Sequence, residues 1–333
     1  SAGASDMSGW MLLGVPGALY ATGVANVWMI AGLIVGAYCN YLFLAKRLRV
    51  YTEVASDSIT IPDFLENRFK DRTKILRIIS GLIILIFFTL YVSSGIIAGG
   101  KTFESFFGLK FAYGAVFTLI IVVFYTFFGG FKAVSITDAF QGLLMFCVLV
   151  SIPVVAYLNL DLPSDTNLIK EISRLDANHL NPFRDQTFWG ILGLLAWGFG
   201  YFGQPHIIVR FMAIRDSKEL AKARRIGIGW MTIGLLGAIM SGLIGFVYFS
   251  QRGGLSDPET VFLKLGELLF PPFFIGIIIS AVLSAIMSTI SSQLLVTSSS
   301  VTKDFIFAFY KKEVSQSTQT AISRYAVVVV AII

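Results

Sequence analysis

The sequence predicts an all-α membrane protein. Of its 333 residues, 56% are hydrophobic and only 14% are charged, against about 25% charged residues in an average soluble domain. Several stretches carry no charge over more than the roughly 20 residues that a membrane-spanning helix needs. Since a bilayer offers no partner to an unpaired backbone group, we expect these stretches to be helices. The composition excludes a soluble enzyme.

The uncharged runs predict about nine membrane segments, at the length that a bilayer requires. The run between Asp6 and Lys46 has room for two helices, with a turn expected at residues 22–26. The later runs cover residues 78–100, 111–131, 139–160, 188–209, 226–251, 268–302 and 325–333. Since the chain starts and stops on apolar sequence, we expect residues 1–333 to be one membrane domain, as a fragment truncated at both ends.

Positive charge is concentrated in every second loop between these segments. Most of the 26 lysines and arginines lie in residues 46–77, at Lys132, and in residues 210–225 and 303–324. By the positive-inside rule these parts face the cytoplasm, and no Arg or Lys is expected inside a span. We expect a short inner helix near residues 60–69. No basic face is interleaved with aromatic residues, so nucleic-acid binding is not expected.

The sequence excludes a disulfide framework, a metal site built from cysteines or histidines, and a nucleotide-binding loop. The two cysteines, Cys39 and Cys147, lie in apolar runs, and two histidines cannot build a His-rich metal site. The segment 95–102, GIIAGGKT, matches the phosphate-binding loop pattern letter for letter. That loop must follow a short strand, whereas here it closes a long apolar run, so no nucleotide is expected.

Two apolar segments are interrupted by flexible residues, at residues 3–10 and 197–206. The glycines lower helix preference, and Pro205 removes a backbone donor. The two interruptions fall on the first and sixth segments. Broken helices at matching places in two halves are typical of transporters with inverted repeats, whose site lies near the membrane midplane. Two ordinary kinked helices are the alternative.

Two acids and one serine stripe are candidates for ion binding. Asp6 and Asp138 are the acids nearest to the apolar runs, and an intramembrane carboxylate indicates a functional site. Asp138 could instead be a helix-start acid that faces cytoplasmic water. Ser284, Ser288 and Ser292 recur every four residues and share one helix face. Their hydroxyls suit a hard cation such as Na⁺, although small residues also serve helix packing.

These residues resemble the sodium/solute symporter family over essentially the whole chain. The most specific matches are SAGASDMSGW at 1–10, WGFGYFGQPHIIVRFMA at 197–213 and MSTISSQLLVTSS at 287–299. The resemblance implies a LeuT-type five-plus-five inverted-repeat helical bundle, running here from the broken first core helix to the start of the ninth. Residues 1–333 would then form a single transporter domain.

The resemblance also implies residue roles. Sodium would be bound by the carbonyls of Ala4, Met7 and Ala285 and the hydroxyls of Ser288 and Thr289. Asp6 would be the acid required for sodium coupling, and Asp138 would lie on the path of ion release. The implied substrate-binding residues are Ser8, Gly9, Trp10, Tyr125, Trp197, Tyr201 and Pro205.

The function implied is uptake of L-proline coupled to sodium entry across the bacterial cytoplasmic membrane, by alternating access and without enzyme activity. Trp197 and Tyr201 would pack against the pyrrolidine ring. A relative that moves another small solute, such as pantothenate or a sugar, is the nearest alternative. A membrane enzyme would need an acid/base or metal cluster, and a channel would need a continuous polar pore. Neither pattern is present in the sequence.

Overall fold

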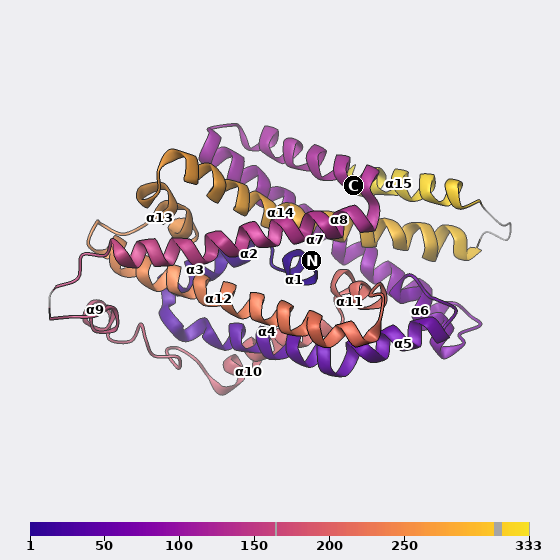
Figure 1. Ribbon diagram of the computed structural model, residues 1–333, viewed down its shortest axis with the longest axis horizontal. Helices are drawn as coiled ribbons and strands as arrows, with labels where there is room; N and C mark the ends of the chain where they lie inside the picture. The colour runs from indigo at the N-terminus through magenta and orange to yellow at the C-terminus, as the bar shows by residue number, and fades with distance from the viewer. Residues whose placement is uncertain (164, 310–314, 333) are drawn as a thin grey trace.

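The computed structural model describes residues 1–163, 165–309 and 315–332. Within this part of the chain every regular element is a helix. The long helices run roughly parallel to the long axis of the molecule (Figure 1). One end carries α5 and α6 with many of the basic residues, and the opposite end carries α9 and α13. We call these the inner and outer ends.

The first two segments form an interrupted helix and a continuous return. They comprise α1 (Ala2–Asp6), α2 (Gly9–Leu12), α3 (Gly14–Thr22), η1 (Gly23–Asn26), α4 (Val27–Cys39), the π-helical η2 (Asn40–Ala45) and α5 (Lys46–Val54). The turn between them lies where it is expected. Gly23 has a φ of 68°, and a Cβ there would lie 1.9 Å from the carbonyl oxygen of His179, so glycine is required.

The third to fifth segments lie in two long helices. They follow the short inner helix α6 (Ile61–Phe69) and comprise α7 (Ile75–Phe107) and α8 (Phe111–Leu158). α8 contains two spans that meet at Gly130, whose φ of 57° and ψ of −163° break the helix. The turn is therefore much shorter than the gap left between residues 131 and 139, because one glycine in a conformation that L-residues avoid reverses the chain.

The remaining chain contains a second interrupted helix, followed by further long helices. It comprises α9 (Leu168–Leu175), α10 (Phe188–Ala196), η3 (Trp197–Phe202), α11 (Pro205–Met212), η4 (Ser217–Glu219), α12 (Leu220–Ser250), η5 (Pro258–Thr260), α13 (Val261–Leu269), α14 (Pro272–Ser299), the π-helical η6 (Ser300–Phe307) and α15 (Gln316–Ile332). Lys311 and Lys312, which the charge pattern assigns to the inner side, lie outside the described residues.

The core forms where α8, α12 and α14 surround the first segment. Met11, Leu12, Leu149 and Leu235 are fully buried there. The outward faces of α7 and α8 instead carry exposed phenylalanines, which suit a lipid environment. In the described residues, five helical stretches are long and apolar enough to cross a membrane. Two of these, at residues 9–54 and 111–158, each contain the two spans already described.

Candidate sodium and substrate site

The first helix is interrupted between α1 and α2. The backbone leaves the helical conformation at Met7 and is extended at Ser8, whose hydroxyl accepts a hydrogen bond from the Trp10 amide at 3.3 Å. Ser8 thus caps the second half of the helix. The break lies near the middle of the long axis (Figure 1), where carbonyls at the end of α1 are released from helical bonding.

The sixth helix is interrupted between η3 and α11. Gly203 and Gln204 separate the two parts, and Pro205 begins α11 at a position that needs no amide donor. Asn40 on η2 donates to the carbonyl oxygen of Tyr201 at 2.9 Å and satisfies one backbone acceptor of η3. The expected interruption is therefore present in both helices.

Four of the five residues expected to bind sodium meet where α1 crosses α14. The Ser288 hydroxyl lies 2.9 Å from the Ala4 carbonyl oxygen and 3.1 Å from that of Ala285. The Thr289 hydroxyl lies 3.2 Å from the same Ala285 oxygen. Met7, the fifth, is buried at the adjacent break. Neutral oxygens gathered in a buried place fit a hard monovalent cation, which would replace the hydroxyl–carbonyl hydrogen bonds among them.

A cavity of about 550 Å³ lies beside these oxygens. Asp6, Met7 and five of the expected substrate residues line it, the five being Ser8, Gly9, Trp10, Trp197 and Tyr201. The Tyr201 hydroxyl donates a hydrogen bond to the Asp6 carboxylate. The indoles of Trp10 and Trp197 stack with their ring centroids 6.2 Å apart. Thr289 also lines this cavity, so the ion oxygens and the aromatic cavity adjoin.

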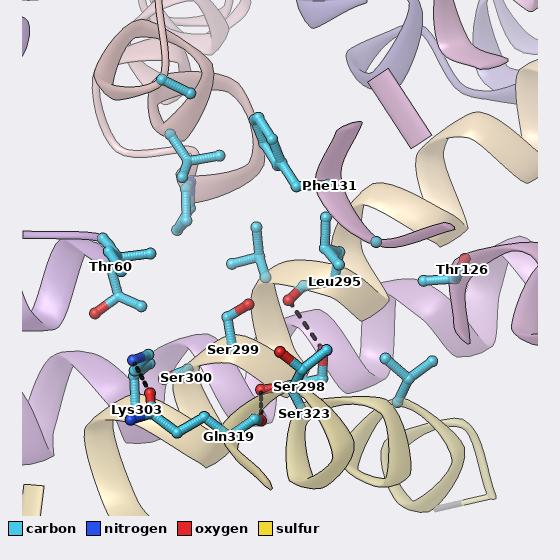
Figure 2. Close-up of a pocket in the computed structure, with 18 of the residues that line it drawn as sticks. Thr60, Thr126, Phe131, Leu295, Ser298, Ser299, Ser300, Lys303, Gln319 and Ser323 are labelled. Atoms are coloured by element: carbon cyan, nitrogen blue, oxygen red, sulfur yellow. Dashed lines mark hydrogen bonds between the residues drawn. The ribbon is translucent and has the colours of Figure 1, made fainter. Parts of the chain in front are cut away.

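Two of the expected substrate residues lie elsewhere. The Tyr125 hydroxyl donates to the Met287 carbonyl oxygen at 2.9 Å, and Tyr125 is absent from the lining of this cavity. Pro205 lines a second cavity of about 600 Å³ toward the inner end. Figure 2 shows that second cavity, with Thr60, Ser299 and Lys303 among its lining residues. Rotation about a helix axis decides such placements, and segment order alone does not reveal it.

The family profile described as the Sodium:solute symporter family matches residues 1–333. The chain belongs to this family. It is 52% identical over 337 residues to "Sodium/proline symporter 2" of Staphylococcus saprophyticus subsp. saprophyticus, and equally so to "Sodium/proline symporter" of Staphylococcus aureus. Each alignment covers 100% of this chain, and the chain spans 65% of the length of these relatives.

Among solved structures, the chain resembles that of a Na⁺-coupled sialic acid symporter, described as substrate-bound and outward-open. The TM-score is 0.86 at 19% sequence identity, covering 99% of this chain and 71% of that chain. This likeness confirms the LeuT-type fold. Together with the apolar helices, family membership makes this chain a multi-pass protein of the cell membrane.

The expectation that no Arg or Lys lies inside a span is wrong. Arg210 continues α11 into the interior, where its guanidinium donates to the Asp138 carboxylate at 2.6 Å and to the Ser292 hydroxyl at 2.8 Å. The Asp138 side chain is fully buried, and that of Arg210 is 9% exposed. Asp138 therefore does not face cytoplasmic water. A buried carboxylate needs a partner, and the basic residue assigned to an inner loop supplies it.

Sequence reasoning missed four polar residues that line the 550 Å³ cavity, namely Tyr91, Ser94, Gln204 and Gln293. Gln293 is fully buried, and among the described residues neither of its amide atoms has a hydrogen-bond partner. Because an unpaired buried amide is costly, Gln293 is suited to meet a polar group inside the cavity. It follows Thr289 by four residues on α14, so a search one helical turn beyond Thr289 finds it.

Proposed function

We propose that the protein takes up L-proline together with Na⁺ across the bacterial cytoplasmic membrane by alternating access. One observation carries the proposal. Neutral oxygens of Ala4, Ala285, Ser288 and Thr289 gather next to a cavity that holds aromatic rings and the Asp6 carboxylate. The names and 52% identity of the staphylococcal relatives support sodium and proline as the two solutes. In this proposal, residues 1–333 act as one transporter domain embedded in the lipid bilayer.

The proposed site divides the work between its two parts. The oxygens at the crossing of α1 and α14 bind Na⁺, with Met7 supplying a further carbonyl. The cavity binds proline through Ser8, Gly9, Trp10, Trp197 and Tyr201, whose rings match the size and apolar character of pyrrolidine. Asp6 joins the two parts, because it ends α1 next to the ion oxygens while Tyr201 holds its carboxylate on the cavity wall.

The driving force is sufficient for accumulation. One positive charge that crosses 100 mV contributes about 2.3 kcal/mol, and a tenfold sodium gradient adds about 1.4 kcal/mol. Their sum corresponds to a proline concentration ratio of roughly 10²–10³ for one coupled ion. Secondary transport therefore requires no catalytic step, and we propose none.

The deciding experiment is uptake of radiolabelled L-proline into proteoliposomes that contain the full-length protein. We expect accumulation with an inward sodium gradient and none in potassium-only buffer. Excess unlabelled pantothenate or glucose tests the alternative substrates and should leave proline uptake unchanged. Equal uptake in sodium and potassium would contradict sodium coupling. Strong competition by pantothenate or by the sugar would contradict proline as the preferred substrate.

Removing either hydroxyl of the sodium site should weaken sodium binding selectively. We expect Ser288→Ala and Thr289→Ala each to raise the sodium concentration for half-maximal uptake by about 10- to 100-fold, since a contact with a charged partner contributes about 1.5–3 kcal/mol. Ser280→Ala, on an exposed face of the same helix, is the control. Unchanged sodium dependence in both variants would show that these hydroxyls only pack helices.

Removing the exposed member of the indole stack should weaken proline binding more than sodium binding. Trp197→Ala deletes an aromatic contact of about 1–3 kcal/mol by buried area, which corresponds to a roughly 5- to 150-fold rise in the dissociation constant for proline. Trp189→Ala removes an indole on α10 that does not line the cavity and is the control. Proline binding at saturating sodium is the measurement. Equal affinities for proline in the two variants would show that the Trp197 ring does not contact proline.

A further inference from the structure

An arginine at the start of α7 gathers three carboxylates from two other elements. Arg77 donates to Asp63 at 2.5 Å and to Glu66 at 2.6 Å, both on α6, and to Asp304 on η6 at 3.2 Å. The Asp304 side chain is fully buried, and the Arg77 side chain is only 12% exposed. Such shielded pairs keep much of their Coulomb energy, unlike exposed surface pairs. The Arg77 cluster therefore joins the inner ends of three elements.

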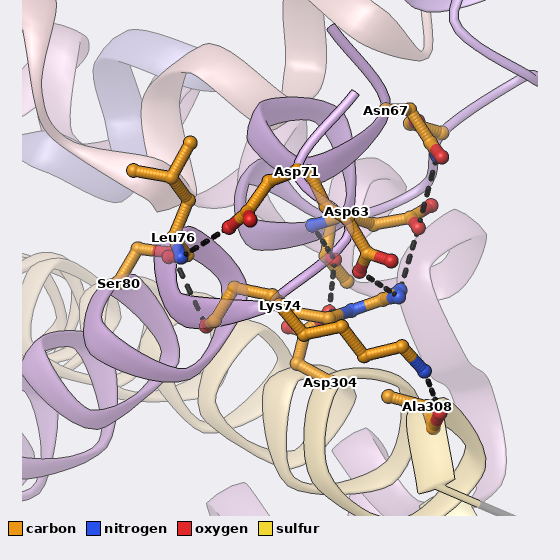
Figure 3. A network of polar contacts seen from close by, with 12 residues as sticks. Asp63, Asn67, Asp71, Lys74, Leu76, Ser80, Asp304 and Ala308 are labelled. Carbon is orange, nitrogen blue, oxygen red and sulfur yellow. Dashed lines mark hydrogen bonds and ion pairs between the residues drawn. The ribbon is translucent and has the colours of Figure 1, made fainter. Parts of the chain in front are cut away.

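Two further contacts tighten the same junction. The Thr60 hydroxyl donates to Asp304 at 2.6 Å, while its oxygen accepts from the Asp63 amide and caps α6. Lys74 donates to the carbonyl oxygen of Ala308, just beyond η6. Figure 3 shows Asp63 and Asp304 close together and Lys74 reaching Ala308. The start of α6 is thus bonded to η6, the π-helical continuation of the helix that carries Ser288 and Thr289.

The segment that this junction holds forms part of the inner cavity. Residues 57–62, which lead into α6 and form its first two positions, all line the 600 Å³ cavity shown in Figure 2. Pro205, Val209 and Met212 of α11 line it as well. Among the described residues, no hydrogen bond or ion pair joins α11 to the Arg77 cluster. The cavity is therefore bordered by a segment fastened to α7 and η6 and by a helix that is not part of that junction.

We propose that Arg77 is a positioning residue that latches residues 57–62 against α7 and η6 as the cytoplasmic gate of the inner cavity. The proposal rests on the proposed transport function, since a gate implies a solute that leaves through it. Charge supplies the mechanism. Three carboxylates share one guanidinium, so without Arg77 they repel one another and the neighbouring ends of α6 and η6 separate.

The test measures access to the cavity without relying on transport. Val209→Cys is introduced into full-length protein whose native cysteines are replaced, and inside-out vesicles are treated with a membrane-impermeant maleimide. We expect Arg77→Gln to speed labelling of this cysteine by about 5-fold or more, the lower end of typical conformational couplings. Glu53→Gln breaks the Arg49–Glu53 pair on the same side, in which the glutamate is exposed, and should leave labelling unchanged.

A second variant and a second readout guard against simple misfolding. Asp304→Asn removes one carboxylate and keeps the other two pairs, so it should fold even if Arg77→Gln does not, and should speed labelling to a smaller extent. In both variants the difference in labelling between sodium and potassium buffers should shrink, which a purely structural role would not cause. Wild-type labelling rates in both variants would overturn the latch. Failure of wild-type protein to accumulate proline would overturn the transport function and leave the labelling result standing.

Discussion

Asp6→Asn should abolish sodium-coupled proline uptake. Among the described residues that line the 550 Å³ cavity, Asp6 is the only charged one, and Tyr201 donates a hydrogen bond to its carboxylate. Asparagine preserves the size of the side chain and removes its charge. At about 4 Å and an effective dielectric constant near 20, a charge pair contributes about 4 kcal/mol. We therefore expect the sodium concentration for half-maximal proline binding to rise by about 10²-fold or more.

Two companion variants separate the charge of Asp6 from its orientation. Asp6→Glu keeps the charge on a longer side chain and should retain some coupled uptake. Tyr201→Phe keeps the ring and removes the hydroxyl that holds the carboxylate, so it should weaken coupling by less than Asp6→Asn. Sodium titration of radiolabelled proline binding to purified full-length protein measures all three. Wild-type sodium dependence in Asp6→Asn would remove Asp6 from the coupling mechanism.

Breaking the buried Asp138–Arg210 pair should destabilise the fold. Asp138→Asn leaves the Arg210 guanidinium in the interior without its ionised partner, and loss of one member of a buried pair costs about 3–5 kcal/mol. The double variant Asp138→Asn/Arg210→Gln removes both charges and should recover most of the thermal stability of the detergent-solubilised full-length protein. We also expect the double variant to keep sodium-stimulated proline binding while turnover slows, because the pair links α11 to α8 and α14.

The double variant provides the decisive comparison for this pair. If Asp138→Asn alone is as stable as wild type, the guanidinium has another partner or reaches water. If the double variant is no more stable than the single variant, the two charges do not act as a pair. Lys264–Glu267, an exposed ion pair at the outer end, is the matched control. Its neutralisation should change stability by less than about 1 kcal/mol.

Much of the architecture follows from local patterns in the sequence. The uncharged runs locate the spans because bilayer thickness fixes helix length. The turn at residues 22–26 and the interruptions near Ser8 and Gly203 follow from glycine and proline chemistry. The four-residue spacing of Ser284, Ser288 and Ser292 correctly indicates one face of α14. Each of these signals acts within a few residues of one helix and needs no knowledge of its neighbours.

What could not be predicted depends on how helices rotate against one another. Arg210 follows an apolar run directly, so hydropathy assigns it to a loop, yet α11 extends past it to Met212. Its carboxylate partner lies 72 positions earlier in the chain. Likewise, Tyr125 and Trp197 are both aromatic residues in apolar segments, and only the packing of α8 against α14 directs Tyr125 away from the cavity. Long-range pairing of this kind leaves no local pattern.

The stacked indoles of Trp10 and Trp197 give the chain an intrinsic optical reporter. The sequence contains five tryptophans. Trp28 and Trp230 donate from their indole nitrogens to the carbonyls of Pro182 and Gly142, away from the cavity. Trp10 and Trp197 line the cavity and stack on each other, so a molecule entering between them changes both their mutual quenching and the polarity around them. Ultraviolet emission from unlabelled protein can therefore follow cavity occupancy in real time, with Trp197→Phe as the silent reference.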